Sequence, residues 1–192
     1  MSRPMQIASA GVSVTFTPAG DRFTQRIEIA GAALLAVDED AESAETWPPS
    51  PPLQDVHLEQ RSEGRQLALM IGRAGLSHWS ISCELDSSAG EVLFDVACRI
   101  KEPAAWLGST YQLPPGVTFS GDEHSGELRM DEHTICRISA DHDCEISWHA
   151  ESKRLVFLPR THAEVPAMSE GNSFPRTIRW RYRLLVVESN PR

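Results

Sequence analysis

Three histidines and two cysteines lie within residues 133–149, HTICRISADHDCEISWH. Imidazoles and thiolates are ligands of Zn²⁺, so the spacings H-x-x-C and H-x-C raise the hypothesis of a structural zinc site. Such a site requires the ligands to converge on one ion. In a β-strand, residues an odd number of positions apart point to opposite faces. The fold of this stretch therefore decides whether the ligands can meet.

The apolar residues of this stretch predict a hairpin that keeps the two thiols apart. Cys136 and Ile138 share one strand face, and Cys144, Ile146 and Trp148 share a face of the next strand. Pairing Ile138 with Ile146 brings both apolar sets to the same side of the hairpin. The two sulfurs then lie about 13 Å apart along the ladder, at ~3.3 Å per residue. We predict neither a disulfide nor a zinc ion between them.

The same geometry scatters the histidines of the stretch. His133 lies three positions from Cys136 and therefore on the opposite face, while His142 falls in the predicted turn. Cys83 and Cys98 belong to apolar faces of two further strands. All the cysteines are therefore predicted to be buried and reduced, as small apolar residues. We predict no metal at these residues and no cofactor.

Two identical triplets, Asp-Glu-His, occur at residues 122–124 and 131–133. Carboxylates together with histidine suit a divalent cation such as Mn²⁺ or Ca²⁺ better than they suit zinc. Exposed acidic loops have the same composition, and the spacing matches no calcium-loop motif. The sequence leaves both alternatives open at residues 122–133.

A hairpin predicted over residues 77–100 has one apolar face and one polar face. Pairing Leu85 with Val92 sends the cysteines and aromatic residues inward and the ionisable residues outward. His78 then becomes the cross-strand neighbour of Arg99, with Cβ atoms about 4.5–5.5 Å apart. A histidine near carboxylates and a guanidinium suits binding of a small polar ligand, or acid–base chemistry; a solvated outer face is the alternative. The candidate ligand-binding residues of this hairpin are His78, Ser82, Glu84, Asp95 and Arg99.

Residues 178–186, IRWRYRLLV, combine an apolar stripe with a row of arginines on the opposite face, namely Arg179, Arg181 and Arg183. Like charges on one face repel each other unless carboxylates or an anionic ligand lie alongside. A neighbouring acidic strand is one explanation, and a site for an anion or an acidic sugar is the other. Arg179 and Arg181 therefore join the candidate ligand-binding residues.

Three aromatic residues lie in segments without regular periodicity: Trp47, Trp106 and Tyr111. Exposed aromatic rings can stack on the apolar faces of sugars. Loop tryptophans can equally close the open ends of a sandwich, and we favour that interpretation here.

Strand periodicity runs through nearly the whole chain. Alternating apolar residues separated by turn signals predict hairpins over residues 12–29, 56–71 and 77–100, and no helix of ten or more residues is expected. Proline and glycine interrupt this pattern, because proline lacks the N–H that a ladder needs. The segments expected to form loops are residues 37–52, 110–126 and 159–176.

This many short antiparallel strands in 192 residues predict a single domain over residues 1–192. The favoured architecture is an all-β, antiparallel two-sheet β-sandwich, with a barrel as the second choice. The expected architecture is similar to the sugar-binding supersandwiches related to galactose mutarotases. That similarity concerns fold class alone and transfers no residue.

The chain has 27 acidic and 18 basic residues, a formal net charge of -9, which opposes binding to nucleic acid or to anionic membranes. No apolar run has the length of a signal peptide or membrane helix, so a cytoplasmic location is expected. Motifs of the common hydrolases and nucleotide-binding loops are absent from the sequence.

We predict a protein that binds a carbohydrate or another small polar, anionic ligand on the polar sheet face. One alternative is a sugar isomerase or hydrolase that uses His78 with Asp95 or Glu84 as acid and base. Another is a protein-interaction module that assembles through a sheet edge or the proline-rich loop, without a small ligand. The sequence does not determine the oligomeric state.

Overall fold

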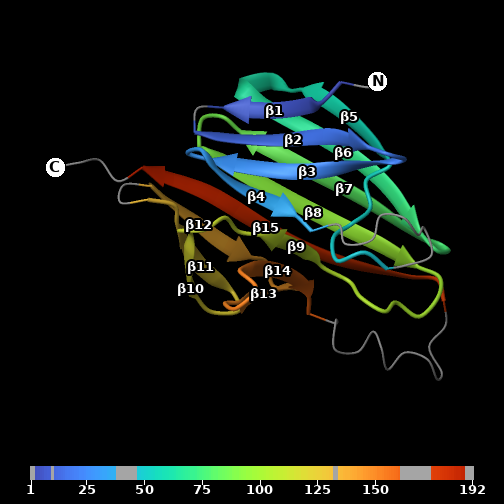
Figure 1. Ribbon diagram of the computed structural model, residues 1–192. Helices are drawn as coiled ribbons and strands as arrows, with labels where there is room; N and C mark the ends of the chain where they lie inside the picture. The colour runs from blue at the N-terminus through green and yellow to red at the C-terminus, as the bar shows by residue number, and fades with distance from the viewer. Residues whose placement is uncertain (1–2, 10, 38–46, 132–133, 161–173, 189–192) are drawn as a thin grey trace.

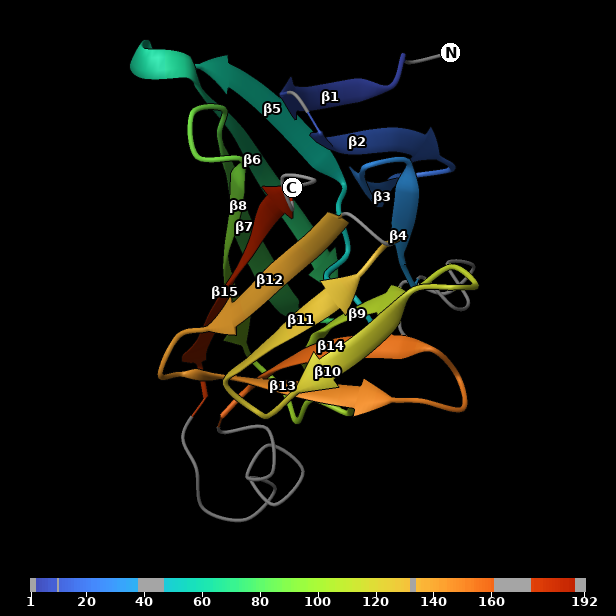
Figure 2. The same cartoon turned by 90° about the vertical axis from the view of Figure 1, so that its left-hand side faces the viewer.

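The computed structural model describes residues 3–9, 11–37, 47–131, 134–160 and 174–188. The described chain is nearly all β-structure, in two antiparallel sheets that pack face to face (Figures 1 and 2). This arrangement confirms the predicted two-sheet sandwich. The described strands form no closed barrel, the second choice from the sequence.

One layer is a seven-stranded sheet that begins at the N-terminal strand and ends with three strands from the second half of the chain. In spatial order its strands are β1 (Met5–Ser9), β2 (Val12–Ala19), β3 (Arg22–Ile29), β4 (Ala32–Ala36), β9 (Ser109–Gln112), β14 (Arg154–Pro159) and β13 (Cys144–His149).

The other layer is an eight-stranded sheet, and a short 3-10 helix, η1 (Ser62–Gly64), lies between two of its strands. In spatial order its strands are β10 (Thr118–Gly121), β11 (Ser125–Arg129), β12 (Thr134–Ala140), β15 (Arg176–Glu188), β8 (Glu91–Ile100), β7 (Ser77–Asp86), β6 (Arg65–Ala74) and β5 (Asp55–Gln60).

The hairpin of β7 and β8 has the register that its residue pattern predicts. Leu85 pairs with Val92, and His78 pairs with Arg99. The turn between the strands is fixed locally, because the Asp86 carboxylate accepts hydrogen bonds from backbone and side-chain donors within the turn. The hairpins predicted over residues 12–29 and 56–71 are also present, as β2–β3 and β5–β6.

The predicted hairpin between Cys136 and Trp148 is wrong. β12 pairs with β11 and β15 in the eight-stranded sheet, whereas β13 pairs with β14 in the seven-stranded sheet. His142 does lie in a turn, but the chain crosses from one sheet to the other at that turn. The apolar alternation places each strand's inner face correctly, but β12 and β13 bond to other strands instead of to each other.

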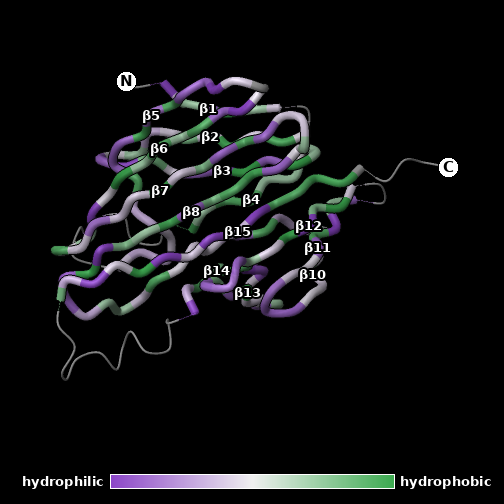
Figure 3. Tube along the Cα trace, turned by 180° about the vertical axis from the view of Figure 1, so that it is seen from behind, coloured by the Kyte–Doolittle hydropathy of each residue, from purple (hydrophilic) through white to green (hydrophobic). Residues whose placement is uncertain are grey.

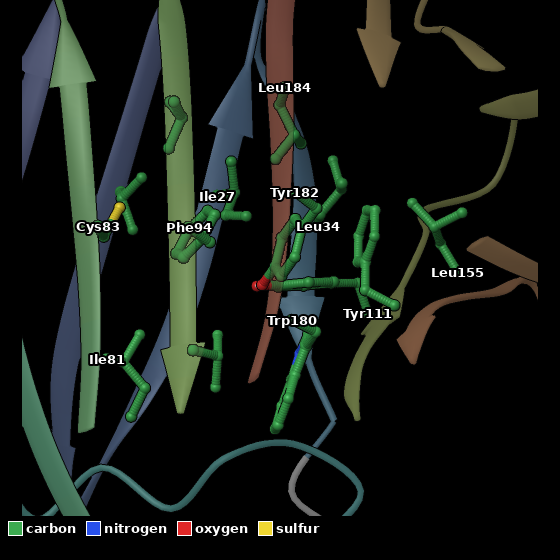
Figure 4. Packing of buried hydrophobic residues seen from close by; sticks show 14 of the residues in the cluster. Ile27, Leu34, Ile81, Cys83, Phe94, Tyr111, Leu155, Trp180, Tyr182 and Leu184 are labelled. Carbon is green, nitrogen blue, oxygen red and sulfur yellow. The ribbon is translucent and has the colours of Figure 1, made fainter. Parts of the chain in front are cut away.

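Aromatic residues fill the space between the sheets. Tyr182 on β15 stacks on Phe157 at a ring-centroid distance of 3.8 Å and on Phe94 at 5.0 Å. Its hydroxyl lies 2.6 Å from that of Tyr111 (Figure 4). Gln25 donates a hydrogen bond of 3.2 Å to Tyr111. Burial raises the pKa of both tyrosines, so these hydroxyls stay protonated and satisfy each other in the core.

The proline-rich part of segment 37–52 is not the surface loop that the sequence suggested. Pro48, Ser50 and Pro52 are buried at one end of the sandwich. A Cβ atom on Gly72 would lie 1.7 Å from the backbone oxygen of Pro52, so glycine is required at this close approach. The acidic part, residues 38–46, lies outside the described residues.

Segment 110–126, expected to be a loop, contains the short strand β10, most of β9 and the start of β11. These strands are too short for alternation to be recognised, which is why the sequence pattern missed them. Most of segment 159–176 lies outside the described residues.

The cysteines are free and buried, as predicted. Burial raises the pKa of Cys136 and of Cys144 to about 12 and that of Cys83 and Cys98 further. The thiols are therefore protonated and unreactive at neutral pH. Cys136 and Cys144 lie in different sheets, so their separation has a different geometric origin from the one predicted.

Candidate functional site

The outer face of the eight-stranded sheet gathers every predicted ligand-binding residue. Strand alternation sends one set of side chains into the core and the other set to this face. Figure 3 views the backbone of the molecule from this side, with β5, β6, β7, β8 and β15 side by side. The predicted residues on this face are His78, Ser82, Glu84, Asp95, Arg99, Arg179 and Arg181.

Asp95 and Arg181 form the shortest ion pair on this face among the described residues. They are cross-strand neighbours on β8 and β15, and the guanidinium donates a 2.5 Å hydrogen bond to the carboxylate. This hydrogen bond raises the pKa of Arg181. Asp141 lies 3.7 Å from Arg181 and 3.6 Å from Arg183. Neutralisation by neighbouring carboxylates therefore accounts for two of the three arginines in the row.

A groove of about 450 Å³ lies beside this ion pair. Ser80, opposite Ala97, and Ser82 leave space in the middle of the face because their side chains are small. Taller side chains of the neighbouring strands enclose that space. The polar and charged residues that line the groove are Asp55, His57, Ser80, Ser82, Asp95 and Arg179.

Arg179 differs from the other two arginines of the row. It is exposed, lies opposite Ala97 and lines the groove. Within the part of the chain that the structure describes, no carboxylate forms an ion pair with it. Its guanidinium is therefore available to a bound anion.

A basic row crosses the sheet next to the groove. Arg73, His78 and Arg99 are consecutive cross-strand neighbours on β6, β7 and β8, and Lys101 follows β8. Partial desolvation, and then the positive charges of Lys101, Arg73 and Arg99, lower the pKa of His78. His78 is therefore neutral at pH 7, and the potential at this end of the sheet is positive.

The remaining candidate, Glu84, does not face the groove. Its carboxylate lies 3.5 Å from Arg65, which also lies 3.5 Å from Asp86. His78 and Asp95 are likewise separated, because Asp95 pairs with Ser82, four residues further along β7, or about 13 Å. The structure thus brings together Ser82, Asp95 and Arg179 at the groove, with His78 and Arg99 in the adjacent basic row.

Half of the groove is formed by β5 and β6 and was not predicted from the sequence. Leu69 and Ile71 are 40% and 57% exposed and line the groove next to His57. Alternation predicts the hairpin of β5 and β6, but it does not indicate that the outer face of this hairpin continues into that of β7. The short turn at Gly75 and Leu76 was the available signal, because it makes β6 and β7 adjacent.

The described residues contain no group of three or more metal-ligating side chains. Asp122, in the first acidic triplet, instead accepts hydrogen bonds of 2.8 Å from the backbone N–H groups of His124 and Ser125. Two residues of the second triplet, 132 and 133, lie outside the described residues.

No known family model matches this sequence, and no curated protein is found to be similar to it. In the described part of the chain, no helix combines the length and apolar character needed to cross a membrane. The function must therefore be inferred from the chemistry of the candidate site.

Proposed function

We propose that this protein binds a small polar, anionic compound, such as an acidic sugar, in the groove on the outer face of the eight-stranded sheet. The observation that carries this proposal is Arg179. A chain with a formal net charge of -9 places this exposed guanidinium beside a groove, without a carboxylate partner among the described residues. Anionic ligands are what guanidinium groups of this kind bind, often with two hydrogen bonds.

The groove offers complementary contacts to each part of such a ligand. A ligand carboxylate pairs with Arg179, and its hydroxyl groups reach Ser80, Ser82 and Asp55. The apolar edge of a sugar ring rests on Leu69 and Ile71. The neighbouring basic row adds long-range attraction for a negative charge.

Catalysis by His78 together with Asp95 or Glu84 gains no support from this geometry. A general acid and base must both reach the reacting atoms. His78 lies four residues along β7 from the row of Asp95, and both carboxylates face arginines instead. Binding is therefore the function that we propose.

The test is a thermal-shift and NMR titration with galacturonate and glucuronate, with galactose and glucose as uncharged probes. We expect the acids to raise the melting temperature and to raise the pKa of His78, because a bound carboxylate stabilises the imidazolium. Arg179→Gln should abolish both the rise in melting temperature and the rise in the pKa of His78. Arg26→Gln removes the same charge from the other sheet, where Arg26 pairs with Glu28 at 2.9 Å, and this variant should still show both changes.

Two results would contradict this proposal. One is the absence of any response to the acids, and the other is an unchanged response in Arg179→Gln.

The second candidate function, self-assembly through this face, is favoured by the exposure of Leu69 and Ile71. A concentration-dependent mass in sedimentation that Ile71→Lys abolishes would establish assembly in place of ligand binding.

A cytoplasmic location belongs to the same proposal. Its support is the state of the thiols, since Cys83, Cys98, Cys136 and Cys144 are all free. Free buried cysteines are typical of proteins from a reducing compartment.

A further inference from the structure

A second groove, here called the tryptophan groove, lies at the end of the sandwich that the proline-rich segment closes. Its volume is about 340 Å³. Trp47, Pro49 and Trp106 form its apolar wall, and His149 and Ser152 lie on the polar side. None of these residues contributes to the groove on the eight-stranded sheet.

The two indole rings are half-buried and held in place. The Trp106 indole N–H donates a hydrogen bond of 3.2 Å to the backbone oxygen of Pro49. Trp47 packs edge-on against buried Trp79, with ring centroids 5.1 Å apart. A ring that is already fixed loses little conformational entropy when a ligand stacks on it. The apolar wall is thus preorganised for a flat partner.

The floor of the groove contributes contact area more than hydrogen bonds. Thr110 and Val156 are cross-strand neighbours on β9 and β14, and both are buried. The Thr110 hydroxyl already donates a hydrogen bond of 2.8 Å to the backbone oxygen of Pro49. Ligand specificity must therefore come from the polar side.

That polar side is built on the turn between β13 and β14, which is also held in place. The Gln112 side-chain amide donates hydrogen bonds to the backbone oxygens of Ser152, at 2.9 Å, and Lys153, at 3.3 Å. His149, at the end of β13, and Ser152, in the turn, are exposed. The imidazole Nε2 lies 3.3 Å from a serine hydroxyl of β13, and the Ser152 hydroxyl donates a hydrogen bond of 3.4 Å to the His149 backbone oxygen, so the imidazole Nδ1 and the lone pairs of the Ser152 oxygen remain for a ligand. Arg154 adds a half-buried guanidinium to the lining.

We infer that the tryptophan groove binds a pyranose ring of a neutral sugar. The C–H face of a pyranose stacks on an indole, while its hydroxyl groups are hydrogen-bond donors and acceptors that match the imidazole of His149 and the hydroxyl of Ser152. A groove of this volume lies within the range for small-molecule sites. A proline-rich peptide would also contact tryptophan faces, but its backbone carbonyl groups only accept hydrogen bonds, whereas sugar hydroxyl groups both donate and accept them, as this polar side requires.

The experiment is a titration with cellotriose, maltotriose and chitotriose, followed by tryptophan fluorescence and by NMR of the histidine ring. We expect at least one trisaccharide to bind, with the His149 resonance shifted. Trp106→Ala should weaken binding by about tenfold or more, because the stacking face is lost. Trp106→Phe should weaken it less, and His149→Ala should weaken it by about threefold to tenfold through the lost hydrogen bond.

Trp148→Phe is the matched control, because Trp148 packs on Phe119 and does not line the tryptophan groove. It should leave the affinity unchanged. Urea unfolding checks that each variant is folded, and His149→Ala tests the site even if Trp106→Ala fails to fold. Failure of all three sugars to bind, unchanged affinity in both Trp106→Phe and His149→Ala, or binding of a decaproline peptide in place of the sugars would overturn the inference. Because Arg179→Gln lies outside this groove, it should not alter trisaccharide binding.

Discussion

The hairpin of β7 and β8 and the stretch from β12 to β13 show the same alternation of apolar and polar residues, yet only the first folds as a hairpin. In both, the residues expected to face the core do so, including Cys83, Cys98, Cys136 and Cys144. Alternation therefore determines which face of a strand is buried. It does not determine which strand becomes the neighbour.

The turns explain why the two regions differ. The turn after Asp86 is closed by its own side-chain hydrogen bonds, so β7 and β8 must pair with each other. In the other region, the turn between β10 and β11 forms backbone hydrogen bonds to both β12 and β13. The Glu123 carbonyl accepts one from the Ile146 N–H, and the His124 carbonyl accepts one from the Ala140 N–H, each at 2.8 Å. These bonds hold β12 and β13 to a third segment, which separates them.

Cross-linking gives the largest expected contrast between a true and a false strand pair. Ser125 and Ser139 are cross-strand neighbours on β11 and β12, so the double substitution Ser125→Cys with Ser139→Cys should form a disulfide under mild oxidation. Arg137→Cys with Ser147→Cys tests a pair of neighbours that the wrong hairpin implies, away from the connecting turn. That pair should not cross-link, because the residues lie in different sheets, which pack about 10 Å apart.

Peptide mapping by mass spectrometry identifies the bond in each double variant, and the buried native thiols stay reduced in both. A disulfide between the thiols introduced at positions 137 and 147, formed in the folded protein, would contradict the strand order. The same result would restore the predicted hairpin between Cys136 and Trp148.

The features that the sequence predicts correctly are those that depend on local alternation, and the features that it misses depend on which strands are neighbours. The sandwich, the register of Leu85 with Val92 and the buried cysteines depend on local alternation, and all were correctly predicted. The groove beside Arg179 depends on which hairpins lie side by side, which periodicity does not encode. Its β5–β6 half was therefore missed, and so was the position of Arg179 beside β8, although Ser82 and Asp95 were correctly placed on one face.

Truncation of a core side chain should lower the free energy of unfolding in both regions, but by different amounts. Phe94 is buried on a central strand and stacks on Tyr182, so Phe94→Ala should lower the free energy of unfolding by about 3–5 kcal/mol. Ile146 is 6% exposed on β13, at the edge of its sheet, and Ile146→Ala should cost about 2–3 kcal/mol. Urea unfolding measures both values, and a larger loss for Ile146→Ala would contradict the central position of β8.

Substitution of the two turn aspartates, Asp86 and Asp122, should give the smallest change in stability, and that change should depend on pH. Hydrogen bonds from Ser88 and then Ala89 lower the pKa of Asp86, and those from His124 and Ser125 lower the pKa of Asp122. Because each carboxyl has a lower pKa in the folded than in the unfolded chain, each stabilises the fold above about pH 4 and loses that contribution as pH falls through the folded value. Asp86→Asn and Asp122→Asn should each flatten the loss of stability below about pH 4, as measured by urea unfolding across the acid range.

Hydrogen exchange distinguishes the two turns, because only one of them holds the crossing strands. Asp122→Ala should speed exchange at the amides of Ile146 and Ala140, whose acceptors are the Glu123 and His124 carbonyls. Asp86→Ala should speed exchange near residues 88 and 89 and leave those amides unchanged. Equal protection of Ile146 in both variants would mean that the β10–β11 turn does not separate β12 from β13. The difference between the two regions would then have to arise from the packing of Ile138 and Ile146 in their respective sheets.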